Sequence, residues 1–129
     1  MFGFIAKRIT IKKIVMGNRE KLAVIWSSRD KDVAEKVVLM YTQGAKMKGW
    51  FSEVVLIVWG PSTKLLAEDG ELQEKVKGLM KSGVKVQACS VCAGEYGVAE
   101  DLEKFGLEVI PMGEPLTGYL KEDWKVLSF

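Results

Sequence analysis

The chain has 129 residues, of which 48% are hydrophobic and 28% are charged, a balance that suits one globular domain with a buried core and excludes a disordered chain. No apolar run approaches the roughly 20 residues that a membrane-spanning helix requires. The sequence contains no histidine, which excludes a Ser-His-Asp triad, a Cys-His pair and an H-E-x-x-H zinc site within the chain.

The net charge of +2 is unevenly distributed. Residues 1–21 hold six basic residues and one acidic residue, which leaves 13 basic and 16 acidic residues, a net charge of −3, in the rest of the chain. Because negative charge on this larger part repels phosphate backbones, we expect no direct binding of nucleic acid.

Residues 1–20 are interpreted as a basic N-terminal extension that precedes a single domain over residues 21–129. The extension lacks the uninterrupted apolar region and the cleavage site of a secretory signal, so we expect a cytoplasmic protein without a transmembrane segment. Three interpretations of it remain open. It is an added strand or hairpin, because Ile9, Thr10 and Ile11 alternate; a basic amphipathic helix that lies on a membrane or a partner; or an extension of the natural chain, which then starts at Met16.

The domain begins with two apolar runs, residues 22–26 and 54–59, which have the length and continuity of strands that are covered on both faces. Between them, Asp30 or Asp32 is placed to cap a helix that ends near Gly49. The apolar side of this helix is predicted to comprise Val33, Val37, Val38, Tyr41 and Ala45.

The second half of the domain continues this alternation. After Gly60 and Pro61 end the second strand, residues 64–68 predict a short helix, and a longer helix begins near Glu71 and ends near Gly83. Residues 84–88 predict a third strand, 107–110 a fourth and 124–127 a fifth. The helices among these strands are marked by Leu72, Val76, Leu79 and Met80, then by Val98, Leu102 and Phe105, and finally by Pro115 at a first helical position with Leu116, Tyr119 and Leu120 on the buried side.

Strands that alternate with helices predict right-handed crossovers and a largely parallel sheet between two helical layers. We therefore expect an α/β fold, a three-layer α/β/α sandwich with a mainly parallel sheet of about five strands, flavodoxin-like in outline. The order of the strands does not follow from the sequence.

The two cysteines of the chain, Cys89 and Cys92, form a C-x-x-C pair where the third strand passes into the next helix. In open α/β sheets, ligands bind beyond the carboxyl ends of the strands, where Cys89 is expected. The free N–H groups and the dipole of a helix N-terminus favour a thiolate, which lowers a thiol pKa from about 8.5 towards neutrality. A thiolate there can attack a disulfide or a sulfane sulfur, and a second cysteine three residues later can resolve the product.

Three other interpretations of the cysteines compete with this one. Free cysteine is often simply buried, and Ala88 and Ala93 indicate a tight apolar environment. A zinc site requires two more ligands from carboxylates or a second chain, so no metal is expected. A structural disulfide is unusual in a reducing cytosol.

Loops that follow the other strands are expected at the same edge of the sheet as the cysteines. The residues that we predict to bind a small anion or the cysteine tail of a partner are Ser27, Trp59, Gly60, Ser62, Met112 and Gly113. Ser27 and Ser28 have an alternative role as helix caps, and Trp59 has one as a core residue. No G-x-G-x-x-G or P-loop pattern is present, so no nucleotide cofactor is expected.

Three segments together resemble the DsrE/DsrF-like family. They are the first strand with its Ser27-Ser28 loop, the second strand ending in Trp59-Gly60-Pro61-Ser62, and Ala88-Cys89-Ser90-Val91-Cys92-Ala93 at the start of a helix. The resemblance covers roughly residues 21–129 and implies a small DsrE-like α/β/α protein that assembles as a trimer or hexamer. It also implies a sulfur relay in which Cys89 carries a persulfide and Cys92 assists, with donor and acceptor proteins as partners.

Three functions are therefore carried forward from the sequence. The first is a sulfur carrier or sulfurtransferase-type protein with a persulfide on Cys89. The second is a C-x-x-C dithiol redox protein, which alternates between dithiol and disulfide. The third is a non-enzymatic oligomeric scaffold or small-ligand binder.

Overall fold

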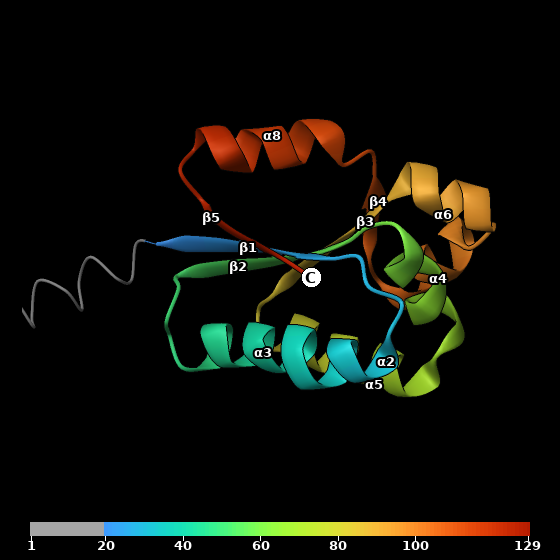
Figure 1. Ribbon diagram of the computed structural model, residues 1–129, viewed down its shortest axis with the longest axis horizontal. Helices are drawn as coiled ribbons and strands as arrows, with labels where there is room; N and C mark the ends of the chain where they lie inside the picture. The colour runs from blue at the N-terminus through green and yellow to red at the C-terminus, as the bar shows by residue number, and fades with distance from the viewer. Residues whose placement is uncertain (1–19) are drawn as a thin grey trace, which may run out of the picture.

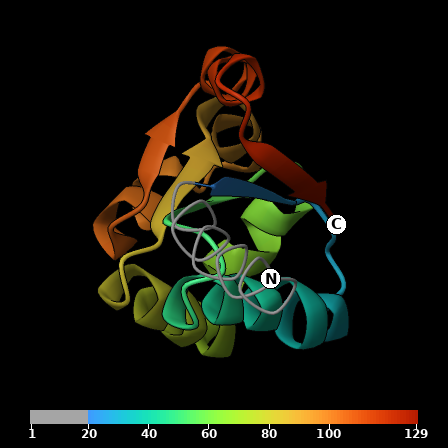
Figure 2. The same ribbon diagram turned by 90° about the vertical axis from the view of Figure 1, so that its left-hand side faces the viewer.

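The computed structural model describes residues 20–129 of the chain. The interpretations of the N-terminal extension as a strand, a helix or an upstream segment lie outside the described residues. The remainder forms three layers, with a twisted sheet between helices (Figures 1 and 2).

All four strand pairings are parallel, and the five strands follow the order β4-β3-β2-β1-β5. The predicted α/β class and parallel five-stranded sheet are thus confirmed. β5 pairs with β1 at one edge and β4 pairs with β3 at the other, so β1, β2 and β3 are central. The strands are β1 (Lys21–Trp26), β2 (Glu53–Val58), β3 (Lys85–Cys89), β4 (Glu108–Ile110) and β5 (Lys125–Ser128).

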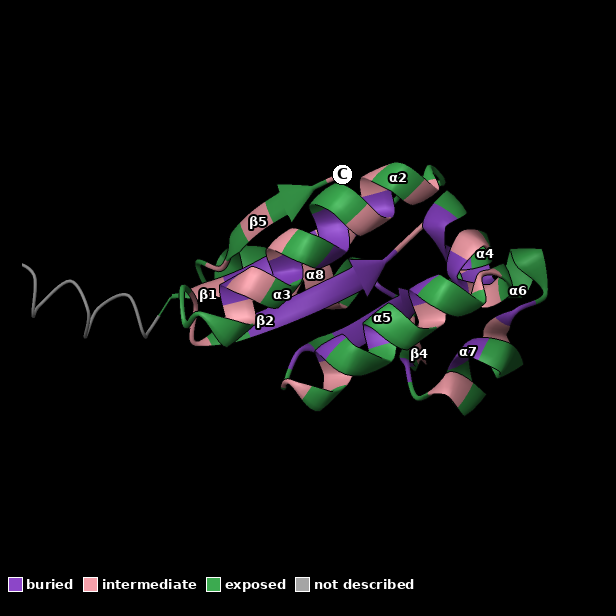
Figure 3. Cartoon of the chain, turned by 90° about the horizontal axis from the view of Figure 1, so that it is seen from below, coloured by how far each residue is buried: buried purple, intermediate pink, exposed green. Residues whose placement is uncertain are grey.

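One face of the sheet is covered by a layer of helices that contains most of the core (Figure 1). Alternate residues of the central strands, such as Leu22, Val24 and Trp26 of β1, point into this layer and are at most 1% exposed. Figure 3 shows the central strands largely buried and β5 mostly exposed. The helices of this layer are α2 (Lys31–Val33), the π-helical turn η1 (Ala34–Val38), α3 (Leu39–Met47) and α5 (Gly70–Lys81).

The opposite face is covered mainly by α8 (Gly113–Lys121) (Figures 1 and 2). The intervening strand residues, whose side chains point to this opposite face, include Ala23, Val55 and Ile57 and form a second and smaller apolar cluster there. Cys89 and Met112 belong to this cluster, so the C-x-x-C pair lies on the thinly covered side of the sheet.

Shorter helices lie beyond the carboxyl ends of the strands, where α4 and α6 contact each other (Figure 1). They are α4 (Pro61–Glu68), α6 (Ser90–Tyr96) and α7 (Ala99–Phe105). None of the helices in residues 20–129 combines the length and the apolar character needed to cross a bilayer.

Two predictions of buried helix faces were partly wrong. Val37 was expected to be buried but is 41% exposed, whereas Val38 is fully buried. The buried positions Ala34, Val38, Thr42 and Ala45 recur every three or four residues, and Val37 lies about 100° around the helix from Val38, outside this face.

The segment after the cysteines was predicted as one helix but forms two. Gly97 ends α6 in the left-handed conformation with φ 72°, and α7 starts at Ala99. Likewise α8 begins at Gly113 rather than at Pro115, and Leu120, expected on its buried side, is 55% exposed. The α4 helix begins at Pro61, which takes the first helical position that its fixed φ favours.

Candidate functional site

Cys89 and Cys92 lie at the carboxyl end of the central strand β3. Cys89 is the last residue of β3 and the N-cap residue of α6, and its side chain makes no capping hydrogen bond. Cys89 is 4% exposed and Cys92 is partly exposed, and no disulfide joins them. Because Cys92 lies in the first turn of α6, the helix holds both thiols in the same apolar cluster.

The neighbourhood of Cys89 affects the protonation of the Cys92 thiol. Burial raises the pKa of the Cys92 thiol above its ordinary value, and the hydrogen bond to Cys89 and the negative charge of an ionised Cys89 raise it further. The Cys92 thiol therefore stays protonated beside Cys89. We had expected a cysteine at this helix start to have a lowered pKa, and Cys92 does not.

The backbone N–H of Gly60 also hydrogen-bonds to Cys92 and acts in the opposite direction, favouring the thiolate. Gly60 links β2 to α4 with φ 76° and ψ −142°, a backbone conformation that residues with a Cβ rarely adopt. The glycine therefore permits the turn that brings this N–H to Cys92.

Met112 and Trp59 form part of the apolar environment of the thiols. Met112 is 1% exposed and belongs to the same cluster as Cys89, and Trp59 packs against this cluster together with Cys92. Gly113, the first residue of α8, is exposed. The structure thus gathers Trp59, Gly60 and Met112 around the cysteines, with Met112 buried in the cluster.

The two predicted serines are engaged in backbone contacts. The Ser62 hydroxyl is buried and donates to the carbonyls of Trp26 and Trp59, which ties α4 to the ends of β1 and β2. The Ser27 hydroxyl donates a 2.9 Å hydrogen bond to the carbonyl of Phe129. Neither serine caps a helix; the Oδ1 of Asp30 accepts from the N–H of Val33 and caps α2.

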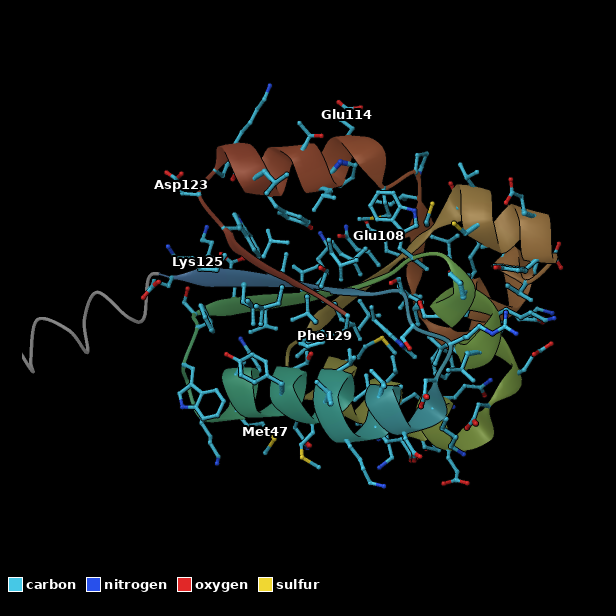
Figure 4. All side chains as sticks on the ribbon, viewed as in Figure 1. Met47, Glu108, Glu114, Asp123, Lys125 and Phe129 are labelled. Carbon is cyan, nitrogen blue, oxygen red and sulfur yellow. The ribbon has the colours of Figure 1, made fainter. Side chains whose placement is uncertain are left out.

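Sequence reasoning missed a buried polar group on the cysteine face of the sheet. Gln87 lies two residues before Cys89, so both side chains point to the same face. The hydroxyl of Tyr119 donates to Oε1 of Gln87 at 2.7 Å, and Nε2 of Gln87 donates to Glu108 at 2.7 Å. Glu108 lies on the α8 side of the sheet (Figure 4). The signal that could have indicated this network was Gln87, a polar residue near the end of a predicted central strand, 84–88.

Within residues 20–129, the side chains that bind metals form no cluster of three or more. Thiolate attack on sulfur, disulfide formation and persulfide storage are the reactions that the pair of thiols supports chemically.

Three solved structures have a similar fold. A conserved protein of unknown function, BT1422 from Bacteroides thetaiotaomicron, is 36% identical, with a TM-score of 0.83 over 88% of this chain and 98% of that chain. MTH1491 from Methanobacterium thermoautotrophicum, also of unknown function, is 15% identical with a TM-score of 0.69, over 85% and 99% of the two chains. The ychN protein from E. coli is 17% identical with a TM-score of 0.59, over 86% and 99%.

No curated protein matches the sequence. The model of the DsrE/DsrF-like family, in contrast, matches residues 20–129, which is the whole of the described domain. Together with the 36% identity to BT1422 over most of both chains, this match shows that the chain belongs to the DsrE/DsrF-like family.

Proposed function

We propose that the protein is a sulfur carrier that holds a sulfane sulfur as a persulfide on Cys89 within an intracellular sulfur relay. The observation that carries the proposal is the placement of Cys89 and Cys92 in one apolar cluster, where β3 ends and α6 begins. The membership of the chain in the DsrE/DsrF-like family supports it.

The position of Cys89 suits it to be the attacking group. Cys89 is the N-cap residue of α6 and therefore lies next to the first helical turn, whose free N–H groups favour negative charge nearby, although its side chain makes no capping hydrogen bond. The Cys89 thiolate attacks the outer sulfur of a donor persulfide, R–S–SH. One S–S bond breaks and one forms, the donor leaves as R–S⁻, and Cys89 becomes Cys–S–SH without net oxidation.

Cys92 has a supporting role in this scheme. Its raised pKa keeps a hydrogen available for donation to the Cys89 thiolate or to the inner persulfide sulfur. The apolar environment formed by Met112 and Trp59 limits the access of water and oxidants to the bound sulfur. Because Cys89 is almost buried, we infer that the segment before α8 moves when sulfur is passed to an acceptor.

We also propose that the carrier is a homo-oligomer, a trimer or a hexamer, with sulfur donor and acceptor proteins as partners. Three large apolar side chains on or just after α3 support self-association: Met40, Met47 and Trp50 are 62%, 65% and 47% exposed. Met47 points away from the sheet, on the outer side of α3 (Figure 4). Sedimentation-velocity analysis tests this directly, and a single monomeric species at micromolar concentration would contradict it.

The sulfur-carrier function is tested by mapping the loaded sulfur. The reduced protein is incubated with a sulfane-sulfur donor, and the modified cysteine is identified by intact-mass and peptide mass spectrometry. We expect one added sulfur that a reductant removes, on Cys89 of the wild type and of Cys92→Ser, and none on Cys89→Ser. Equal loading of Cys89→Ser and wild type would reject the assignment of Cys89.

A dithiol redox protein is the second candidate, because two free cysteines three residues apart in one apolar cluster also favour disulfide formation. This function predicts a defined reduction potential and the loss of activity when either cysteine is replaced. Titration in thiol–disulfide redox buffers decides between the candidates. Failure to form the Cys89–Cys92 disulfide under mild oxidants would exclude this second function.

A further inference from the structure

A cleft of about 250 Å³ lies at the same edge of the fold as the cysteines, between the loop after β1, α4 and the end of α6. It is lined by Arg29, Pro61, Lys64, Leu65, Glu68 and Tyr96, and we call it the Arg29–Lys64 cleft. One water molecule occupies about 30 Å³ of liquid, so the cleft has space for a ligand several times larger than water.

The two cations of this cleft are available to a ligand. Among residues 20–129, neither Arg29 nor Lys64 takes part in an ion pair, although Lys64 and Glu68 are four residues apart on α4. The remaining lining residues are the apolar Pro61 and Leu65, the aromatic Tyr96, which is 41% exposed, and one acid, Glu68, so the two cations outnumber the single carboxylate. The guanidinium of Arg29 and the ammonium of Lys64, beside an aromatic ring and apolar side chains, suit an organic anion rather than a neutral ligand.

The cleft adjoins the thiol pair along two elements. Pro61 directly follows Gly60, whose N–H contacts Cys92. Tyr96 lies four residues after Cys92 on α6, about 6 Å along the helix axis, and on the same side of the helix. Lys64 lies about 4.5 Å along α4 from Pro61, further from the thiols. A ligand held by the cations therefore needs a spacer to place its sulfur at the cysteines.

We propose that the Arg29–Lys64 cleft binds the carboxylates of a small acidic peptide thiol and directs its sulfur to the C-x-x-C pair. The inference rests on the proposed sulfur-carrier function and names the class of its donor or acceptor. An inorganic oxyanion is too short to contact both the cations and the thiols, whereas a peptide of two or three residues has the necessary length. In loading, the peptide persulfide gives its outer sulfur to Cys89 and leaves as the peptide thiolate, which restores the original number of S–S bonds.

The first test compares three disulfides that differ in charge and share one reaction. Oxidised glutathione carries carboxylates, hydroxyethyl disulfide is neutral and cystamine is cationic. In each case a protein thiolate attacks one sulfur, forms a mixed disulfide and releases one thiolate. The quantity compared is the ratio of the reaction rate with oxidised glutathione to the rate with the neutral disulfide. We expect this ratio to be higher for the wild-type protein than for a small model thiol. We expect added salt to lower the ratio for the protein.

The variant Arg29→Gln/Lys64→Gln removes both cations without altering the thiols. We expect it to lower the ratio of glutathione-disulfide rate to neutral-disulfide rate by about three- to tenfold, as for two exposed ion pairs. The control, Lys121→Gln with Lys125→Gln, makes the same change in net charge at and after the end of α8. We expect this control to leave the ratio within twofold of wild type, because Lys121 and Lys125 do not line the cleft.

A second measurement does not depend on thiol reactivity. S-methylglutathione, which cannot exchange, is titrated into the protein, and NMR amide shifts are followed. We expect saturable shifts at Arg29, Lys64 and Tyr96 that the double variant abolishes. Absence of these shifts, or an unchanged rate ratio in the double variant, overturns the inference. If Cys89 carries a persulfide but the protein does not prefer the anionic disulfide, only the proposal for the cleft is rejected. If the protein prefers the anionic disulfide but no persulfide forms, only the sulfur-carrier function is rejected.

Discussion

The hydroxyl of Tyr119, on α8, donates a 2.7 Å hydrogen bond to the side-chain carbonyl oxygen of Gln87, on β3. Gln87 is 2% exposed and stands two residues before Cys89 on the same face of the sheet. Its Nε2 also donates to Glu108 of β4. One buried amide therefore connects the strand that carries Cys89 to the helix that covers it.

Replacing Tyr119 by phenylalanine tests this connection. The substitution Tyr119→Phe leaves the carbonyl oxygen of Gln87 without its donor, and we expect the free energy of unfolding to fall by about 1–3 kcal/mol. We also expect faster alkylation of Cys89, because α8 is held less firmly. Tyr41→Phe is the matched control, since the Tyr41 hydroxyl is not among the hydrogen-bonding side chains of the described residues and its ring packs against Trp50. Equal effects of the two substitutions would contradict the role of the hydroxyl.

The contribution of Tyr119 is expected to depend on pH. Burial raises the pKa of the Tyr119 phenol above 10.0, and the negative charge of Glu108 adds to the shift. Since the folded state favours the neutral phenol, its stabilising effect is complete below the ordinary pKa and is lost as pH rises through the raised pKa. The stability difference between wild type and Tyr119→Phe should therefore shrink above pH 10. Urea unfolding at pH 8 and above pH 10 measures the difference in the free energy of unfolding between the two proteins. A difference that stays constant with pH would contradict the pH dependence expected for Tyr119.

Asp69 is expected to stabilise the start of α5 at neutral pH and to lose this effect in acid. Its Oδ1 accepts a 3.0 Å hydrogen bond from the N–H of Leu72, and this bond, with the ammonium of Lys31, lowers the pKa of the carboxyl below 3.8. The substitution Asp69→Ala should cost about 0.5–2 kcal/mol at pH 7. This cost should diminish as pH falls through the lowered pKa, because the cap is then protonated in both states.

Asparagine provides the control for this cap. Asp69→Asn keeps an oxygen that can accept from Leu72 and loses only an exposed ion pair with Lys31, so it should cost less than Asp69→Ala. Thermal unfolding at pH 7 and pH 3 compares the three proteins. A loss in Asp69→Asn as large as in Asp69→Ala would show that the charge, and not the cap, is stabilising.

Thr63 offers a prediction of increased stability. The residue is fully buried in α4, and its hydroxyl has no hydrogen-bond partner among the described residues. Thr63→Val keeps the shape and removes the unpaired hydroxyl, so we expect a gain of about 1 kcal/mol. Thr42→Val is the comparison, because the Thr42 hydroxyl donates to the carbonyl of Val38 at 2.7 Å and its removal should destabilise. If guanidinium unfolding shows a loss for both variants, the Thr63 hydroxyl has a partner.

The strands could be predicted from the sequence because burial on both faces leaves a direct signal. The runs 22–26 and 54–58 are apolar at nearly every position, and both are central strands of a parallel sheet. The position of Cys89 at the end of β3 followed from the same pattern. The order of the strands did not, because it depends on long-range crossovers rather than on local periodicity.

The details that the sequence could not provide arise from tertiary contacts or from single backbone angles. The π-helical turn from Ala34 to Val38 leaves no residue pattern, since it depends on one displaced hydrogen bond, from the N–H of Leu39 to the carbonyl of Ala34. The separation of α6 from α7 depends on the left-handed conformation of Gly97, which is as compatible with a loop as with a helix end. The partners of the Gln87 amide come from residues 21 and 32 positions away.

The site shows the same division. The proximity of Cys89 and Cys92 could be inferred from their spacing, but the raised pKa of the Cys92 thiol could not, because burial in the folded chain is its largest cause. Ser62 was a plausible ligand from its place after β2, yet its buried hydroxyl binds the Trp26 and Trp59 carbonyls. The position of Ser62 after a strand could be predicted from the sequence, but the hydrogen-bond partners of its hydroxyl are set by backbone carbonyls from two different strand ends.

The most direct test of the central claim is a pulse–chase experiment with isotopically labelled sulfur. Reduced wild-type protein, Cys89→Ser and Cys92→Ser are loaded with a persulfide donor whose outer sulfur is ³⁴S, then chased with excess acceptor thiol while peptide masses are followed. The account predicts that ³⁴S appears on Cys89 of wild type and Cys92→Ser and then moves to the acceptor, with no label on Cys89→Ser. Label that resides on Cys92 alone, or a Cys89–Cys92 disulfide that forms without any retained ³⁴S, would contradict it.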